Sequence, residues 1–210
     1  MLFDFDTLSL ADRYKLLIST VVPRPIAWVV TQDLQGRLNA APFSFFNAVC
    51  SDPPIVVIGI GGRAPGNIKD TGHNIRETGE FVVNLVSHDN LRQMNVTAIE
   101  FPPEVNELAE AGLTTVPSSK VKPPRIAESP VALECRRTML IDLNVDRTLV
   151  VGQVLALHVR DDCVLDAARH HVDTPRLDLV GRMHGAGWYT RTGQLEELPR
   201  IPVSEWRRRS

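Results

Sequence analysis

Apolar residues recur along this chain mainly in the patterns of β-strands. "IAWVVT" (26–31) is rich in β-branched residues, and "IVVIGIG" (55–61) is apolar throughout, which is typical of a strand buried on both faces. Further strands are predicted over residues 38–49, 80–86, 131–144 and 149–162. Short turns separate most of these segments, so the pattern indicates antiparallel hairpins.

Helices are predicted between the strands. "SLADRYKLLIST" (9–20) begins with a capping box of Ser9 and Asp12, and a second helix over about 67–78 is closed by Gly79. The apolar stripe of the first helix comprises Leu10, Tyr14, Leu17 and Ile18. Shorter or partial helices are predicted over 87–98, 102–113 and 165–183.

The proline-rich segment 114–130 shows no periodicity and is predicted to be an extended, ordered loop. Residues 184–198 close the domain as a turn and a short strand. A strand count of six or seven with inserted helices favours an antiparallel barrel over a parallel doubly wound sheet.

The segment "NAAPFSFFNAV" (39–49) carries aromatic rings on both sides of its predicted strand. With period two, one face holds Phe43, Phe45 and Asn47, and the other holds Ser44, Phe46 and Ala48. A strand that faces water on one side is apolar on its other side only. Both faces therefore need cover, and Asn47 needs a polar partner, which predicts a ligand or a partner subunit.

Composition sets further bounds. A chain of 210 residues and 23.3 kDa is expected to form one domain over 1–210, with a helix at 9–20 and a tail at 193–210. A formal charge of -2 gives no case for nucleic acid as a partner. The acidic N-terminus and the lack of any apolar run near ~18 residues predict a cytoplasmic protein with no membrane span.

The cysteines indicate a reducing compartment, because they are odd in number and widely spaced, and we interpret them as buried or incidental thiols: Cys50, Cys135 and Cys163. No metal site is predicted. The sequence has no G-x-S-x-G elbow, Walker A loop or H-E-x-x-H, and "GIGGRAPG" is not a dinucleotide fingerprint. A barrel without an evident nucleophile could instead hold a cofactor that supplies the chemistry.

Three motifs, P-R-P-I-A, A-P-F-S-F-F-N and K-D-T-x-x-N-I, follow one another from residue 23 to residue 75. In this order and spacing they resemble the flavin reductase-like family, and the similarity covers roughly residues 20–192. The resemblance implies a mostly β fold, an FMN-binding split β-barrel, flavoredoxin-like, with Greek-key-like antiparallel strands and peripheral helices. It also implies a homodimer with FMN at the subunit interface, so that one face of the Phe43–Asn47 strand fills the barrel and the other lies beneath the flavin.

The resemblance also implies roles for particular residues. Lys69 and Thr71 would contact the FMN phosphate while Asp70 orders the loop; the alternative is a helix first turn with solvated charges. Backbone and side chains of the "RLNAAPFSFF" strand would line the ring and ribityl chain, with Pro42 marking a bulge, or the phenylalanines are simply core. The candidate cofactor-binding set is Arg24, Asn39, Pro42, Phe43, Ser44, Phe45, Phe46, Asn47, Arg63, Lys69, Asp70, Thr71 and Arg182.

Arg24 and Arg63 are equally explained as ordinary surface arginines. In "GRMHGAGWY" (181–189), His184 is the catalytic candidate that would hydrogen-bond the ring or donate to substrate, with a structural histidine as the alternative. Trp188 and Tyr189 are expected to be core anchors.

Two functions from different classes follow. The first is an FMN-binding oxidoreductase, an NAD(P)H:flavin reductase that takes hydride from NADH or NADPH and passes electrons to oxygen, a partner monooxygenase or another acceptor. The second is an FMN-holding electron carrier or sensor without NAD(P)H turnover. A ligand-free interaction domain would be colourless and would not quench FMN fluorescence.

Overall fold

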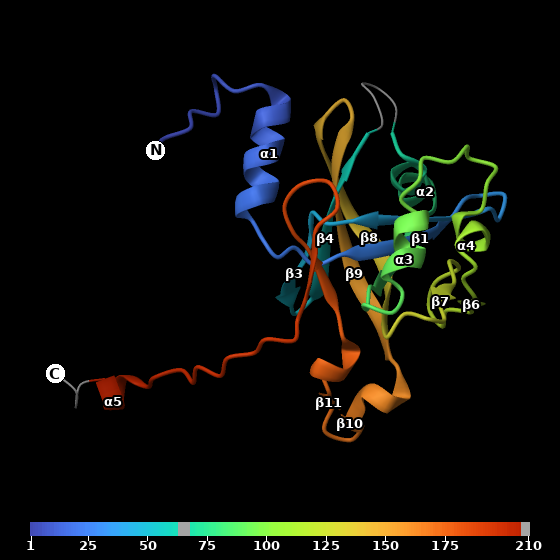
Figure 1. The fold of residues 1–210 in the computed structure, drawn as a ribbon. Helices are drawn as coiled ribbons and strands as arrows, with labels where there is room; N and C mark the ends of the chain where they lie inside the picture. The colour runs from blue at the N-terminus through green and yellow to red at the C-terminus, as the bar shows by residue number, and fades with distance from the viewer. Residues whose placement is uncertain (63–67, 207–210) are drawn as a thin grey trace.

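A computed structural model describes residues 1–62 and 68–206, which are built around one seven-stranded antiparallel sheet (Figure 1). The strands lie in the order β2-β1-β5-β8-β9-β4-β3. Their bounds are Ala27–Gln32 (β1), Leu38–Phe43 (β2), Phe46–Ser51 (β3), Pro54–Gly61 (β4), Glu80–Leu85 (β5), Val131–Asn144 (β8) and Arg147–Val159 (β9). The predicted mostly β, antiparallel fold is confirmed.

The sheet closes into a split barrel because of how β2 and β3 are joined. These strands stand at opposite edges of the sheet, yet only Ser44 and Phe45 separate them in the chain. In a flat sheet the two edges would lie about 29 Å apart, whereas the link spans at most about 11 Å. The sheet therefore curls until its edges meet, and the Gly59 N–H donates to the Phe45 carbonyl beside the seam (2.7 Å).

Two apolar cores lie on the two sides of β1. Ala27 and Val29 point into a cluster inside the barrel, whereas Trp28 and Val30 point into a second cluster outside it. The outer cluster is covered by α3 (Leu91–Val96), α4 (Glu107–Glu110) and the loop that carries β6 (Thr115–Val116) and β7 (Arg125–Ile126) (Figure 1). β1 is thus buried on both faces, which explains its continuous apolar sequence.

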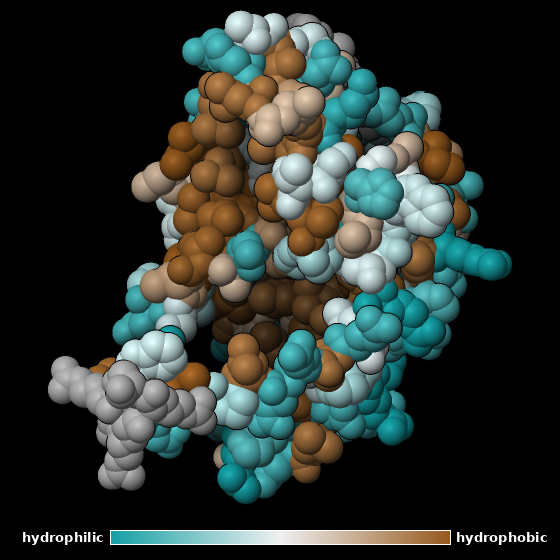
Figure 2. Space-filling model, turned by 60° about the vertical axis from the view of Figure 1, so that its left-hand side comes forward, coloured by the Kyte–Doolittle hydropathy of each residue, from teal (hydrophilic) through white to brown (hydrophobic). Residues whose placement is uncertain are grey.

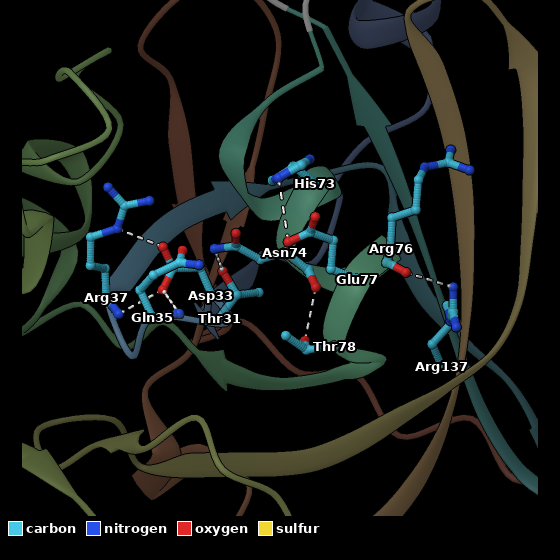
Figure 3. Close-up of polar contacts among 10 residues, drawn as sticks. All are labelled: Thr31, Asp33, Gln35, Arg37, His73, Asn74, Arg76, Glu77, Thr78 and Arg137. Atoms are coloured by element: carbon cyan, nitrogen blue, oxygen red, sulfur yellow. Dashed lines mark hydrogen bonds and ion pairs between the residues drawn. The ribbon is translucent and has the colours of Figure 1, made fainter.

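Helix α2 (Asp70–Thr78) packs against β1, and polar contacts fix its position (Figure 3). Asn74 Nδ2 donates to Thr31 Oγ1 (3.0 Å), and Arg137 Nη1 donates to the Arg76 carbonyl (3.2 Å). The helix ends at Gly79, whose φ of 72° only glycine adopts readily, as predicted. Its first turn is thereby held at a defined place beside β2.

The single strand predicted over 38–49 is wrong, because the chain turns at Ser44 and Phe45. The alternation of faces does not continue through this turn. Phe43 and Phe46 both pack on the inner core, while Phe45 points outward and meets Tyr14 edge-on at 6.5 Å between ring centroids. The rings are thus divided between the barrel interior and the surface near the N-terminal helix.

That helix, α1 (Leu10–Thr20), stands beside the barrel (Figure 1). Its predicted cap is confirmed, since Ser9 Oγ accepts from the Asp12 N–H (3.2 Å). Its stripe is largely uncovered: Ile18 is buried, but Leu10 is 82% exposed. None of the described helices has the length and apolar character to cross a lipid bilayer.

The other predicted elements shift in detail. The second helix begins at Asp70 rather than near 67, the helices predicted over 87–98 and 102–113 shorten to α3 and α4, and the loop 114–130 contains β6 and β7. The C-terminal part holds η1 (Asp161–Cys163), β10 (Val164–Asp166), β11 (His171–Val172), η2 (Pro175–Leu177), β12 (Val180–Arg182), β13 (Tyr189–Arg191) and α5 (Val203–Trp206). Cys50 is exposed, whereas Cys135 and Cys163 are buried.

Candidate functional site

Two adjoining clefts along β2 share part of their lining, and together we call them the β2 groove. A polar cleft of about 110 Å³ is lined by, among others, Asn39, Lys69, Asp70, Thr71 and Glu107. A more apolar cleft of about 250 Å³ is lined by, among others, Tyr14, Ile26, Phe43, Ser44, Met94, Arg182 and Tyr189. Pro42 and Ala98 line both clefts, so the groove has a polar end and an apolar end that meet at these residues.

The polar end is organised by a buried network. The orientation of the Asn39 amide that satisfies its neighbours directs its nitrogen to Glu107 Oε1 (3.2 Å) and its oxygen to Thr71 Oγ1 (2.8 Å). Glu107 also accepts from the Ala40 N–H (3.1 Å). The Thr71 hydroxyl therefore donates to Asn39, which leaves its lone pairs toward other partners. The side chains that frame this end are fixed before any ligand arrives.

The first turn of α2 and the Lys69 side chain are the groups of the polar end that suit an anion, beside the acidic residues Asp70, Glu100 and Glu107 of the same cleft. Lys69 occupies the N-cap position of the nine-residue helix. Its ammonium lies 5.9 Å from the centroid of the Phe43 ring. A helix N-terminus combined with an ammonium group is a general solution for binding phosphate.

Glu107 is a part of this end that sequence reasoning missed. It is only 5% exposed, although "NELAE" has the polarity of a surface helix. Asn106 caps this short helix by accepting from the Leu108 N–H (3.0 Å). No local signal in the sequence could have shown that this turn of helix closes over β2.

The apolar end combines flat apolar walls with a few polar groups. Arg182 stacks on Tyr189, with 4.7 Å between its guanidinium carbon and the ring centroid, and Nη2 donates to the Ala186 carbonyl (2.7 Å). Ser44 lies at the end of β2, next to Phe43. Apolar walls with a guanidinium and a hydroxyl at the edge suit a planar, polar-edged ring system.

Arg24 is neither a surface arginine nor a wall of the β2 groove. It is 5% exposed, and its guanidinium donates to the Ile18, Val21 and Met183 carbonyls at 2.9, 2.8 and 3.0 Å. Nε reaches Ser44 Oγ at 3.4 Å. Burial lowers the pKa of Arg24. Arg24 thus joins the end of α1 to the groove and helps to position Ser44.

Several predicted residues lie outside the β2 groove among the described parts of the chain. Phe45 is 47% exposed, Phe46 packs on the inner core, and Asn47 is exposed, with its own Oδ1 accepting from the Ala48 N–H (2.9 Å). His184 is exposed and stacks on Trp188 at 5.8 Å. Trp188 is 64% exposed, so its expected role as a core anchor is wrong. Arg63 lies outside the described residues.

The groove fits the two demands of FMN. Its polar end offers an ammonium group and a helix N-terminus to a phosphate, and its apolar end offers Ile26, Phe43 and Met94 to ring faces. The two ends adjoin at Pro42 and Ala98, as the two halves of one ligand require. The residues present are therefore suited to this cofactor.

The family match and the fold together define a class, the flavin-related oxidoreductases. The sequence profile described as flavin reductase like domain matches residues 19–175, and the chain belongs to that family.

Individual proteins agree with this assignment. An uncharacterized protein of Deinococcus radiodurans is 46% identical over 208 residues, covering 97% of this chain and 91% of that one. Nitrilotriacetate monooxygenase component B from Bacillus cereus superposes with a TM-score of 0.88 at 30% identity, covering 94% of this chain and 98% of that one. The 2-nitrobenzoate 2-nitroreductase NbaA of Pseudomonas fluorescens gives 0.87 at 31% identity, covering 97% of each.

Proposed function

We propose that this chain binds FMN in the β2 groove and acts as an NAD(P)H-dependent flavin reductase. The electrons then pass to oxygen, a partner monooxygenase or another acceptor. One observation carries the proposal: the cleft beside Lys69 and the α2 N-terminus adjoins an apolar cleft edged by Arg182, and the two clefts share Pro42 and Ala98. The similarity to a monooxygenase component B supports a monooxygenase as the acceptor.

Different residues would bind the phosphate and the ring of FMN at the two ends of the β2 groove. Lys69 and the α2 N-terminus would hold the phosphate, while Asn39, Thr71 and Glu107 keep this end in shape. Phe43, Ile26 and Met94 would pack on the ring and exclude water from it. When bound, FMN supplies a ring that accepts hydride and returns electrons. Arg182, which lines the apolar end, would offer positive charge to a ring that gains negative charge on reduction.

His184 remains the candidate for delivering a proton to a substrate. It lies in the loop between β12 and β13, from which Arg182, Ala186 and Tyr189 line the groove. Its stacking on Trp188 keeps the imidazole at the surface. A substrate that approached over this loop would meet it before reaching the ring.

We also propose a homodimer whose interface lies beside the flavin. Tyr14 lines the apolar end and touches Phe45, and both belong to an apolar surface that includes Leu10 and Leu17. In a single chain this surface faces water next to the cofactor groove. A second subunit would cover it and shield the ring.

The test uses the purified full-length chain. FMN is titrated while its fluorescence is followed, and then NADH or NADPH is added and absorbance at the nicotinamide band is recorded. Quenching with oxidation of either nucleotide is the expected result. Quenching without oxidation would replace the reductase by a carrier or sensor, and no quenching at all would overturn the flavin assignment.

A further inference from the structure

The last described segment of the chain, residues 193–206, is an arm that leaves the barrel (Figure 1). Every residue of this arm with a described side chain is exposed. For the described part of the arm, the hydrogen bonds run from the Glu205 and Trp206 N–H groups to the Pro202 carbonyl, inside the arm itself. The arm therefore draws no support from the body of its own chain.

The sequence of the arm is suited to packing along an apolar surface. Leu195, Leu198 and Ile201 recur every third residue and are 69%, 87% and 47% exposed. Pro199 and Pro202 favour the polyproline II conformation, whose repeat of three residues places such side chains along one edge. Trp206, 64% exposed, extends the apolar character to the end of the arm. A tail that stays in solvent gains nothing from apolar side chains at every third position.

The point at which the arm departs is firmly anchored. Arg191 donates two hydrogen bonds to Asp178, from Nε to Oδ1 (3.0 Å) and from Nη2 to Oδ2 (2.7 Å). Thr192 Oγ1 donates to the Leu179 carbonyl (3.3 Å). The direction in which residue 193 leaves the barrel is thus set by β13 and not by the arm.

A large groove opens at the same place. Its volume is about 960 Å³, and its apolar lining includes Pro25, Ile26, Leu85, Val86, Leu179 and Met183. Figure 2 shows apolar surface gathered around a hollow on this side of the molecule. We call it the arm groove, because residues 190–195 form one of its walls. It shares Ile26 and Tyr189 with the apolar end of the β2 groove.

We propose that the arm of one subunit packs its Leu198–Ile201 edge into the arm groove of a second copy, and that the exchange is reciprocal. Arm and groove start from the same anchored strand: residues 193–195 line the groove of their own chain, and the rest of the arm runs away from the barrel (Figure 1). A two-fold axis beside this strand lets each arm fill the other groove. The 14 residues of 193–206 reach about 40 Å in an extended proline-rich conformation, which is enough to cross a subunit.

This inference rests on the proposed homodimer but not on the proposed flavin chemistry. It has a consequence for the site, however. Ile26 and Tyr189 would be packed from one side by the arm of the partner and from the other by the groove's ligand. The arm of the partner would then make the wall formed by Ile26 and Tyr189 more rigid, and the flavin ring would lie against this wall.

The first experiment measures the monomer–dimer constant of the full-length chain by sedimentation without flavin. Leu198→Gln with Ile201→Gln removes two apolar anchors and leaves the net charge unchanged. The matched control, Glu197→Gln with Arg200→Gln, changes neighbouring polar positions and also leaves the net charge unchanged. We expect the first pair to weaken the dimer at least about tenfold and the second to leave it within about twofold. Equal behaviour of both variants would overturn the proposal.

The second experiment identifies the chain that receives the arm. In a Cys50→Ser background, Leu179→Cys in the groove and Arg200→Cys in the arm are joined by a short bismaleimide, and the linked peptides are identified by mass spectrometry. A 179–200 link between chains is expected, and it must also form when two proteins that each carry one of the two introduced cysteines are mixed; Cys135 and Cys163 are buried and stay in place. A link within one chain, or no link, would show that the arm does not exchange. An FMN titration of the same proteins tests the flavin assignment separately.

Discussion

Lys69 lines the polar end of the β2 groove and lies close to Phe43 of the apolar end. It holds the N-cap of α2, and its ammonium rests over the Phe43 ring at 5.9 Å. A cation over a ring face is a weak interaction compared with an ammonium–phosphate contact. The ammonium is therefore available to a phosphate at little cost.

Replacing Lys69 by Met tests this role. The variant keeps the length and apolar stem of the side chain but loses the charge-assisted contact, which contributes about 1.5–3 kcal/mol. We expect FMN to bind about 10- to 100-fold more weakly. Riboflavin, which lacks the phosphate, should bind equally to both proteins. Both affinities are read from the quenching of flavin fluorescence.

Lys122→Met serves as the matched control, because Lys122 is exposed and does not line the described groove. It should alter neither affinity. An equal loss of FMN and riboflavin affinity in Lys69→Met would mean that the substitution distorts the groove, and the phosphate would have to be placed elsewhere.

Glu134 is a buried carboxylate of a different kind, which holds the proline-rich loop on β8. It accepts from the Ser119 and Lys120 N–H groups at 2.8 and 2.5 Å and from His158 Nε2 at 2.5 Å. Burial acts to raise the pKa of Glu134, but the hydrogen bonds from Ser119, His158 and Lys120 outweigh it and lower the pKa below its usual value.

Glu134→Gln should therefore destabilise the chain in a pH-dependent way. A carboxyl whose pKa is lowered by folding stabilises the folded state above its unfolded pKa of about 4.3, and this contribution is lost as pH falls through the folded pKa. At pH 7 we expect a loss of about 1–3 kcal/mol, or roughly 3–10 °C in Tm. The difference in Tm between Glu134→Gln and the unsubstituted chain should become smaller below about pH 4. Thermal unfolding from pH 3 to pH 8 measures this difference. Glu110→Gln, at an exposed position, is the control and should have the Tm of the unsubstituted chain throughout.

At the scale of elements, β9 can pair with β8 and β4 and still leave room for Phe81 of β5 because residue 152 has no side chain. A Cβ on Gly152 would stand 2.4 Å from Phe81 Cζ, inside the barrel core. Phe81 is fully buried and cannot move aside without opening a cavity.

Gly152→Ala should thus cost about 1–3 kcal/mol through overpacking. A chemical denaturation curve should show a lower midpoint with an unchanged slope. Gly193→Ala is the matched control, since a Cβ there meets nothing within 4 Å. If both variants unfolded at the same denaturant concentration, the contact with Phe81 would be looser than the structure indicates.

The elements that the sequence predicts well are those set by local chemistry. The β8 bounds agree with the prediction, the Ser9 cap forms, and Gly79 ends α2, because each depends on neighbouring residues. The break between β2 and β3 depends on the meeting of two sheet edges far apart in the fold, so period two could not reveal it. The exposed stripe of α1 has a similar cause, since periodicity does not say whether the covering surface belongs to the same chain.

The same distinction between features set by neighbouring residues and features set by distant contacts applies to the candidate site. Eight predicted residues do line the groove, and all but Asn39 and Arg182 stand in the three motifs that carried the family resemblance: Asn39, Pro42, Phe43, Ser44, Lys69, Asp70, Thr71 and Arg182. Tyr14, Met94 and Glu107 come from helices whose own sequences look ordinary, and Ala98 comes from the turn after α3. Arg24 stood out in the sequence for its place between two prolines, but its partners are carbonyls spread from residue 18 to residue 183. Such distant contacts exist only in the folded chain.

At the scale of the whole molecule, the apolar end of the β2 groove is bordered by surfaces that one chain leaves uncovered. Tyr14 is 56% exposed while it lines the groove, and Tyr189 lies between this groove and the arm groove. If a second subunit covers these surfaces, flavin binding and dimerisation act on the same residues. The two equilibria must then be coupled, and the coupling must be equal in both directions.

We therefore expect saturating FMN to tighten the dimer by a factor within about 5- to 150-fold. Because a dimer takes up two FMN molecules, each site should bind FMN more tightly by the square root of this factor when the protein concentration is raised from far below to far above the dimer constant. Sedimentation with and without FMN gives the first factor, and fluorescence titrations at the two protein concentrations give the second. Leu198→Gln with Ile201→Gln should bind FMN weakly when dilute and regain affinity when concentrated. If FMN binds but leaves the dimer constant unchanged, the flavin does not lie at the subunit interface.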